Sequence, residues 1–459
     1  MRKQKLATAV ATVAFCGALG VAAGLAGCSP QVSQSGASNA SESQATGETN
    51  AGGEKTMQEW GELYPLQYNS YATLNYKQVD FGAEDGLGLY EDKTERPHGH
   101  FATLAMEVGP LARDSEGNLL FTDDARFGVD SLEYNSETGQ WYVDDSNWVE
   151  VINDAGYTKG CYACRSSKFD VAYEQEGAEV YGEPVDQEFA DLLNGQLWDC
   201  AICHEETPGD EPDATLTMFT QLSGDAFDQF DPEERACGQC HNTFNHRKFI
   251  TDQETMDSFD PYKYGTDIDS LLQAELEDGI YDVDEDTGIK IGCFDEPELE
   301  MTQGSPMNEL GVTCIDCHMP KVTDPETGET YTDHNASGSP LAREESLEYC
   351  LTCHKSQGIE TTDDMVEMVR SKQREAREAL GSAQARMDEA YELIKAAVQD
   401  GSVDENTLNQ VRDDYTRVDA YLHITNGDSN GRVVHNNDKL NDYLARANNL
   451  LDGIMEKLA

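Results

Sequence analysis

The sequence predicts a mainly α-helical fold that ends in long C-terminal helices. The clearest observation is an apolar stripe at helical spacing over residues 362–398, a pattern typical of an amphipathic helix. Thr362 or Asp363 can cap this helix, and Asp400-Gly401 is expected to end it. The stripe consists of Val369, Ala376, Leu380, Ala383, Met387, Tyr391, Ile394 and Val398.

Two further helices are expected over residues 404–425 and 438–458. The glycine- and asparagine-rich run at 426–431 separates them, because such residues favour turns. Strand signals are short, and the clearest one is at 139–143. Long terminal helices usually serve packing or oligomerisation, so the chain could form a homodimer.

Ten of the thirteen cysteines form five Cys-x-x-Cys pairs, and histidine directly follows four of the pairs. This pattern is typical of covalent haem attachment, in which two thiols bind the porphyrin and the histidine becomes an axial iron ligand. Neither a zinc site nor a disulfide scaffold needs a histidine after each pair. The attachment cysteines are Cys161 and Cys164, Cys200 and Cys203, Cys237 and Cys240, Cys314 and Cys317, and Cys350 and Cys353; the histidines are His204, His241, His318 and His354.

The sequence therefore predicts five covalently bound haems c, which we number one to five in the order of their motifs. The first motif differs from the others because Arg165 follows Cys164 where histidine is expected. A guanidinium has no free lone pair and stays protonated, so it is a poor iron ligand.

The N-terminus predicts export and a lipid anchor. Three positive charges precede an apolar run, which stops at Leu25-Ala-Gly-Cys28, a tetrad similar to a bacterial lipobox. The alanine- and glycine-rich run is less typical of a membrane-spanning helix. We expect a signal peptide at 1–27, lipidation of Cys28, a flexible tether at 28–56 and an extracytoplasmic location, either periplasmic or on the outer face of the cell membrane.

The remaining chain is expected to form a pentahaem domain at 57–360 and a helical region at 361–459. Haem would replace much of the side-chain core, which explains a hydrophobic content of only 38%. The net charge is −56, or −59 after removal of Arg2, Lys3 and Lys5. This charge excludes nucleic acid and anionic lipid as partners of the general surface. A solvated acidic face and docking of a basic redox partner both remain open.

The chain resembles the pentahaem, ammonia-forming cytochrome c nitrite reductases from Leu63 to its C-terminus. The resemblance rests on Tyr64-Pro-Leu-Gln-Tyr-Asn-Ser, on Pro97-His-Gly-His100 and, above all, on the run from Val312 to Val322 followed by Tyr331-Thr-Asp-His334. The order of the motifs also fits, with an unusual first motif before four that carry histidine.

The resemblance implies distal ligands for four haems. His334 would be the distal ligand of the second haem, His100 of the third and His435 of the fourth. Met307 stands where the family has a histidine for the fifth haem, and a thioether ligand ordinarily raises the potential. A core methionine is the alternative for Met307.

The resemblance also implies that the first haem is the active site, where the family has lysine in place of Arg165. Candidates to bind this iron from below are Lys159, Lys168, His246 and Cys293. Arg113 matches the family's catalytic arginine. Phe244 stands in place of its catalytic tyrosine, and Glu296, at the end of Cys293-Phe-Asp-Glu296, stands in place of its catalytic histidine. Thr243 and Asp295 are a thin remnant of the family's calcium site, so calcium is doubtful.

Two functions follow from these observations. The first is a reductase of nitrite or a related small substrate that takes electrons from a membrane quinol dehydrogenase or another redox protein, with Arg113, Arg165, Cys293 and Glu296 at its active site. The second is a non-catalytic electron-transfer cytochrome that feeds another reductase.

Overall fold

The structure is a computed structural model that describes residues 55, 57–72, 107–108, 132–135, 140–143, 149, 153, 158–193, 199–204, 212–244, 250–336, 339–428 and 431–459. All of these belong to one compact unit, Gly52–Ala459. The expected signal peptide, Cys28 and nearly all of the tether lie outside the described residues. The boundary between residues 360 and 361 stays a prediction, since both sides fall within the same unit.

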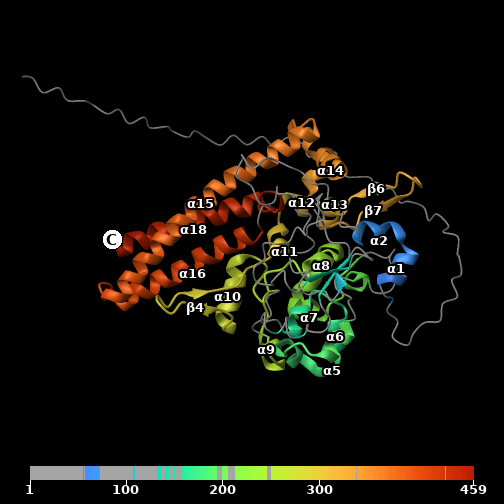
Figure 1. Cartoon of the computed structure of the whole chain (residues 1–459). Coiled ribbons are helices and arrows are strands. Elements are labelled where there is room, and N and C mark those ends of the chain that lie inside the picture. The colour runs from blue at the N-terminus through green and yellow to red at the C-terminus, as the bar shows by residue number, and fades with distance from the viewer. Residues whose placement is uncertain are drawn as a thin grey trace, which may run out of the picture. The chain divides into compact units, whose positions relative to one another are not determined.

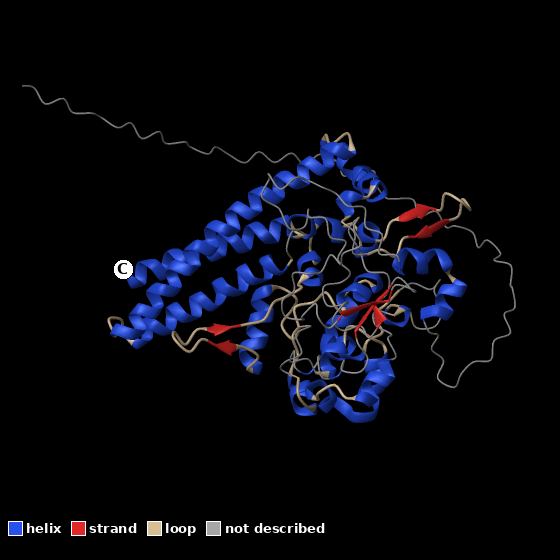
Figure 2. Ribbon diagram, viewed as in Figure 1, coloured by secondary structure: helices blue, strands red, loops and turns tan. Residues whose placement is uncertain are grey.

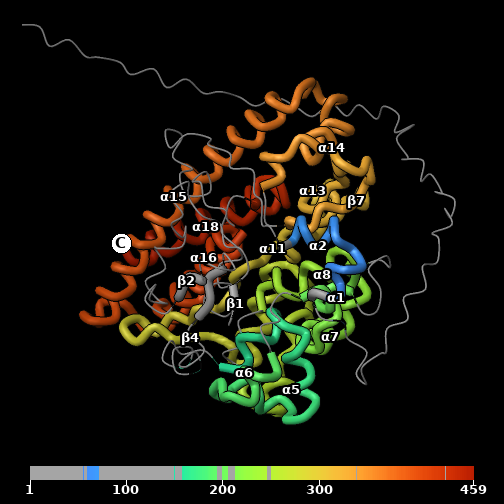
Figure 3. The backbone as a smooth tube through the Cα atoms, turned by 45° about the vertical axis from the view of Figure 1, so that its right-hand side comes forward, coloured from blue at the N-terminus to red at the C-terminus, as the bar shows by residue number. Residues whose placement is uncertain are grey.

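Helices dominate the described chain, as Figure 2 shows, and the predicted mainly α fold is confirmed. The three long helices are α15 (Thr362–Asp400), α16 (Glu405–Gly427) and α18 (Asn437–Leu458). They pack against one another and lie side by side in Figures 1 and 3. The periodic pattern predicted all three.

The ends of these helices correct the sequence prediction in detail. Thr361, not Thr362 or Asp363, caps α15, because its side chain accepts a hydrogen bond from the backbone N–H of Asp364. The Asp364 side chain reaches back in return, which completes a capping box. At the other end Gly401 has a φ of 64°, a left-handed conformation that favours glycine.

The apolar stripe of α15 faces the core. Ala383, Ala390 and Ile394 are fully buried there, while Tyr391 and Val398 are partly buried at its edge. The same hydrophobic cluster continues into α16 and α18 and into the aromatic residues Tyr162, Phe169 and Tyr181. The long helices are therefore part of the packing that supports the first motif.

The rest of the described chain consists mainly of short helices. This is the part that carries the five motifs. Its α-helices are α1 (Met57–Leu63), α2 (Pro65–Ala72), α5 (Lys168–Glu176), α6 (Gln187–Leu193), α7 (Thr217–Ser223), α8 (Pro232–Gly238), α9 (Gln253–Ser258), α10 (Ile268–Asp278), α11 (Glu298–Thr302), α12 (Pro306–Glu309), α13 (Cys314–His318), α14 (Glu344–His354) and α17 (Arg432–His435); its 3-10 helices are η3 (Lys159–Tyr162), η4 (Gly177–Gly182), η5 (Cys200–Ile202), η6 (Gly224–Gln229), η8 (Pro340–Ala342) and η9 (Lys355–Gln357).

Three small antiparallel sheets complete the described fold. The first has the order β1-β3-β2, with β1 at Glu107–Val108, β2 at Leu132–Asn135 and β3 at Gln140–Val143, which agrees with the strand predicted at 139–143. In its register Leu132 pairs with Val143. The other two are the hairpins β4-β5 (Asp282–Val283, Lys290–Ile291) and β6-β7 (Lys321–Thr323, Thr330–Thr332). Among the helices that the structure describes, none has the length and apolar character needed to cross a membrane.

Candidate haem sites and active site

Each Cys-x-x-Cys motif lies on a helical turn. The first is on η3 and the turn after it, the second on η5, the third at the end of α8, the fourth on α13 and the fifth in the last turn of α14. The N–H of His241 donates to the carbonyl of Cys237 at 3.0 Å, and His204 donates to Cys200 at 3.1 Å. A helical turn places residues i, i+3 and i+4 on one side, so both thiols and the histidine can meet one porphyrin.

The thiols are available for haem attachment. None of the eleven cysteines in the described ranges forms a disulfide. The sulfur of Cys240 donates to the carbonyl of Cys164 at 2.9 Å, which joins the third motif to the first. The sulfur of Cys203 donates to the carbonyl of Ala236 at 3.8 Å, which joins the second motif to the third.

The later motifs continue this chain of neighbours. Cys314 and Cys237 share a hydrogen bond, because α13 packs against α8. Cys317 lies close enough to Cys350 for the two to interact, and α13 also packs against α14. The motifs thus adjoin in the order one, three, four and five, with the second beside the third.

Two pairs of histidines from distant segments face one another. The ring centres of His204 and His334 are 6.3 Å apart, and those of His318 and His435 are also 6.3 Å apart. Two imidazoles that share one metal ion at bonds of about 2 Å have ring centres about 6 Å apart. These separations fit the axial ligand pairs that the resemblance implies for the second and fourth haems.

Four of the candidate ligands have their rings held by a hydrogen bond at Nδ1, which would leave Nε2 to bind iron. A hydrogen bond from Nδ1 fixes the tautomer and leaves Nε2 as the metal-binding atom. The four acceptors are the Thr332 carbonyl for His334 at 2.8 Å, the Ala336 carbonyl for His318 at 3.3 Å, Glu298 Oε2 for His241 at 3.2 Å and Asp428 Oδ1 for His435 at 2.6 Å.

The fifth haem has the weakest support from the geometry. His354 ends α14, and its Nδ1 is buried with no hydrogen-bond partner among the described residues. Met307 lies on α12, is partly buried and belongs to none of the hydrophobic clusters of the described chain. That placement argues against a plain core methionine. His100, the implied ligand of the third haem, lies outside the described residues.

The contacts of Arg165 do not support a role as an iron ligand. Its Nη1 donates to the carbonyl of Cys161, one turn back. Burial disfavours the charged guanidinium, but Cys164, Cys161 and Glu296 outweigh burial and raise the pKa of Arg165. Once the sulfurs are thioethers they carry no charge, so Glu296 is the negative group that remains. The guanidinium stays protonated and has no lone pair to offer.

The contacts of Lys159 also argue against its role as a ligand of the first iron. Its side chain is 4% exposed and its Nζ contacts carboxylate oxygens of Glu176 at 3.1 Å, Glu183 at 2.9 Å and Asp186 at 3.1 Å. Burial lowers the pKa of this ammonium, but the three carboxylates outweigh burial and raise it. A protonated amine cannot bind iron. Lys168 begins α5, and His246 lies outside the described residues.

Glu296 is a strained residue beside the first motif. Its φ of 50° is the only positive value for a non-glycine residue in the described chain. Burial raises the pKa of its carboxyl, while the charges of His241 and Arg165 lower it. Strain of this kind persists where the surrounding structure enforces it, often at functional sites. The structure thus brings together two of the predicted active-site residues, Arg165 and Glu296.

Cys293 belongs to a polar chain that the sequence did not reveal. Its sulfur donates to Asp295 Oδ2 at 3.6 Å, and Asp295 Oδ1 accepts from His423 Nε2 at 2.8 Å. Burial opposes protonation of His423, but Asp295 outweighs burial and raises its pKa. Cys293 also lines a small cavity with Thr243 and Phe244, so these three predicted positions do meet. No sequence signal links His423 to Asp295, because they are distant in the chain.

The positions of the family's tyrosine and calcium ligand have core roles here. Phe244 is 4% exposed and stacks on Phe219 with ring centres 6.0 Å apart. Thr243 donates from both its N–H and its hydroxyl to Glu300 Oε1, at 3.1 and 3.0 Å, and Tyr262 donates to the same oxygen at 2.7 Å. Within the described ranges no three His, Cys, Asp or Glu side chains are arranged to hold a metal ion. Arg113 lies outside the described residues.

Comparisons with known proteins agree with this geometry. The sequence model of the family described as cytochrome c552 matches residues 56–453. Cytochrome c-552 of Haemophilus ducreyi (strain 35000HP / ATCC 700724) is 27% identical over 266 residues, 53% of this chain and 50% of that protein. The chain thus aligns with about half the length of this curated relative.

A solved structure shows the same fold. It is the catalytic subunit of the cytochrome c nitrite reductase from Desulfovibrio desulfuricans ATCC 27774, a structure described with two calcium sites. The likeness covers 88% of this chain and 86% of that one, with a TM-score of 0.59 and 18% identity. Such low identity establishes the fold and not the activity. With the family match over nearly the whole chain, the resemblance seen in the sequence is confirmed, and the chain belongs to the cytochrome c552 family.

Proposed function

We propose that this protein is an exported pentahaem c-type cytochrome that reduces nitrite or a related small substrate at its first haem. The observation that carries the proposal is the pairing of His204 with His334 and of His318 with His435, each at 6.3 Å. These pairs come from separate parts of the chain, and a shared iron is the simplest reason for imidazoles to face one another at this distance.

The residues present fit covalently bound haems, which supply one-electron redox chemistry when bound. The ten paired cysteines would hold the five porphyrins. His204 with His334 and His318 with His435 would complete the second and fourth irons, His241 with His100 the third, and His354 with Met307 the fifth. The contacts between motifs would let electrons pass among the low-spin centres to the first.

At the first haem the chain's own residues would provide the charge and the protons. Arg165 stays cationic beside Glu296, whose pKa is raised by burial. A carboxyl with a raised pKa can hold a proton at Oε and deliver it as negative charge builds on a substrate. Arg113 would add positive charge to attract an anion. Cys293 would lie beside the pocket.

The setting proposed for this chemistry is outside the cytoplasm. Signal cleavage before Cys28 and lipidation of that cysteine would anchor the protein to a membrane and place it near a membrane quinol dehydrogenase or another redox protein as donor. The acidic surface, with a net charge of −56, suits a basic partner and not nucleic acid. A homodimer through the long helices remains part of the proposal.

The second candidate is a non-catalytic electron-transfer cytochrome. It is favoured by Phe244, which fills the position of the family's catalytic phenol with a buried core ring. The hydrogen bond from Arg165 to the backbone of its own turn also favours this second function.

Ligand binding separates the two functions. Cyanide and nitrite are added to the ferric and the reduced protein, and optical spectra are recorded. A reductase needs one haem that binds these ligands, and it turns over nitrite or hydroxylamine with reduced viologen as donor. Absence of both spectral change and turnover leaves the electron-transfer function.

A further inference from the structure

We propose that Asp428 is a positioning residue that lowers the reduction potential of the fourth haem, by accepting the hydrogen bond of its ligand His435. Glu298 acts in the same way on His241 of the third haem. The inference rests on the proposed function only in taking these histidines as iron ligands.

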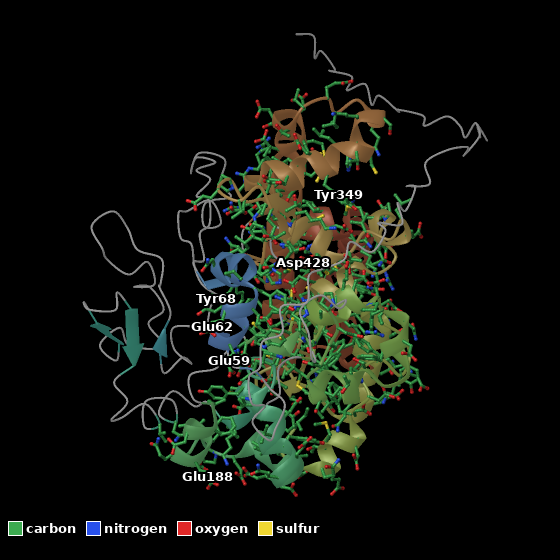
Figure 4. The ribbon with its side chains drawn as sticks, turned by 90° about the vertical axis from the view of Figure 1, so that its right-hand side faces the viewer. Glu59, Glu62, Tyr68, Glu188, Tyr349 and Asp428 are labelled. Atoms are coloured by element: carbon green, nitrogen blue, oxygen red, sulfur yellow. The ribbon has the colours of Figure 1, made fainter. Side chains whose placement is uncertain are left out.

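The contact between Asp428 and His435 is short and shielded from water. Asp428 Oδ1 lies 2.6 Å from His435 Nδ1, and the Asp428 side chain is fully buried. Asp428 Oδ2 has no hydrogen-bond partner among the described residues, so the imidazole is the only side-chain donor that the described structure offers to this carboxylate. Asp428 is labelled in Figure 4.

The backbone around this contact is shaped to permit it. The N–H of Gly431 donates to the carbonyl of Asp428 at 2.9 Å, and the N–H of His435 donates to the carbonyl of Gly431 at 2.8 Å. A Cβ at position 431 would lie 2.6 Å from Asp428 Oδ1 and 2.8 Å from His435 Nδ1. A larger residue would force the carboxylate or the imidazole to move, so glycine at this position permits their close approach.

A carboxylate acts differently from a carbonyl in this position. Both accept the Nδ1 proton, but a negative acceptor draws that proton more strongly and makes Nε2 a better electron donor. A stronger donor, with a buried negative charge nearby, favours ferric over ferrous iron. Asp428 would keep the proton on His435 Nδ1 in both oxidation states of a bound haem, so one electron from a reductant would be the only change.

The other described ligands provide the contrast. His318, whose ring faces that of His435, and His334, which would serve the second haem, both donate to backbone carbonyls. His241 donates to Glu298 Oε2 at 3.2 Å, and α11, which begins at Glu298, packs against α17, which ends at His435. Two carboxylates thus accept hydrogen bonds from candidate ligands of the third and fourth haems, whereas the described hydrogen bond of the His334 ring goes to a carbonyl and Asp333 acts on it only through its charge. The third and fourth haems should therefore titrate below the second.

The test is a reductive titration of the purified, full-length holoprotein with dithionite, followed by optical and low-temperature EPR spectra. Asp428→Asn keeps an acceptor oxygen but removes the charge. One of the five components should shift upward by about tenfold in its ferric-to-ferrous equilibrium, which is about 59 mV for one electron. One low-spin EPR signal should move with it. Gly431→Ala should shift the same component in the same direction.

The matched control is Asp438→Asn, which removes an exposed charge three residues beyond His435 and should leave all five components unchanged. If Asp428→Asn titrates in the same way as Asp438→Asn, the inference is overturned. The proposed function would still stand in that case, provided that both variants keep five haems and their low-spin signals. If the unaltered protein does not show these low-spin signals, the proposed function itself is wrong. If Asp428→Asn loses a haem, Glu298→Gln must give the upward shift at the third haem; no shift there also overturns the inference.

Discussion

The rings of His318 and His435 face one another at 6.3 Å, although one follows the fourth motif and the other precedes the last helix. Burial and the neighbouring His435 lower the pKa of His318 to about 4, whereas Asp428 outweighs burial and raises the pKa of His435 to about 9. The fourth haem would thus tie the C-terminal helices to the motif-bearing part of the chain.

Removing His435 should open the fourth iron. We expect His435→Ala to convert one haem from low spin to high spin and to let it bind carbon monoxide, because the distal imidazole is lost. Asp438→Asn is the control, because it removes an exposed charge three residues beyond His435 and should change no spin state. Optical and EPR spectra of the two variants check this. Equal spectra for both would show that His435 is not a ligand.

The haem count should be five. The mature protein should show five porphyrin increments by mass spectrometry, because all ten paired cysteines lie on helical turns and none is in a disulfide within the described ranges. Replacing both Cys161 and Cys164 by serine should remove one increment only. Four increments in the unaltered protein would mean that the first motif carries no haem and would remove the proposed active site.

Met307→His should lower the potential of a single haem. A thioether favours ferrous iron relative to imidazole, so the fifth haem is expected to titrate well above the others. Potentiometric titration of the variant should show one component moved downward and four unchanged. Met455→His, in the last turn of α18, is a control for the added imidazole. An unchanged titration for Met307→His would make Met307 a packing residue.

Lys159→Met should destabilise the region around the first motif. The substitution leaves Glu176, Glu183 and Asp186 without their shared cation, but these carboxylates are half-exposed. The free energy of unfolding should fall by an amount between that of an exposed ion pair, about 1 kcal/mol, and that of a buried one, about 3 kcal/mol. Denaturant unfolding measures it, and Lys395→Met, at an exposed pair with Asp286, should cost less.

The pH dependence of stability should change in the same variant. Hydrogen bonding to Lys159 lowers the pKa of Glu183 below its ordinary value of 4.5. A lowered folded-state pKa gives stability that is present above the unfolded value and is lost as the pH falls through the folded value. Lys159→Met should therefore reduce the loss of stability below about pH 4.5. An identical acid limb in both proteins would contradict this role for Lys159.

The sequence revealed what is local or periodic and missed what is assembled by folding. The apolar stripe of α15 and the five Cys-x-x-Cys motifs are patterns of residues close together in the sequence, so they could be predicted. The cap of α15, Thr361, lies one or two residues before the predicted Thr362 or Asp363, because all three residues are good caps and only the reciprocal bond with Asp364 decides among them. The partnership of His435 with Asp428 depends on how the chain turns at Gly431, which no spacing rule encodes.

The chemistry of the first haem depends on charge in its pocket. If nitrite is reduced there, Arg113→Ala should lower kcat/KM by about a hundredfold, the usual cost of losing one preorganised donor to a developing negative charge. Cys293→Ser should alter the spectrum of one haem only, because the thiol lies beside Thr243 and Phe244 and bonds to Asp295. Steady-state assays with nitrite and hydroxylamine, using reduced viologen, measure the first effect, and Arg377→Ala on the exposed face of α15 controls for loss of a positive charge. Equal activity in the two arginine variants would exclude Arg113 from the site. A protein that neither turns over these substrates nor changes its spectrum when they are added would be an electron carrier.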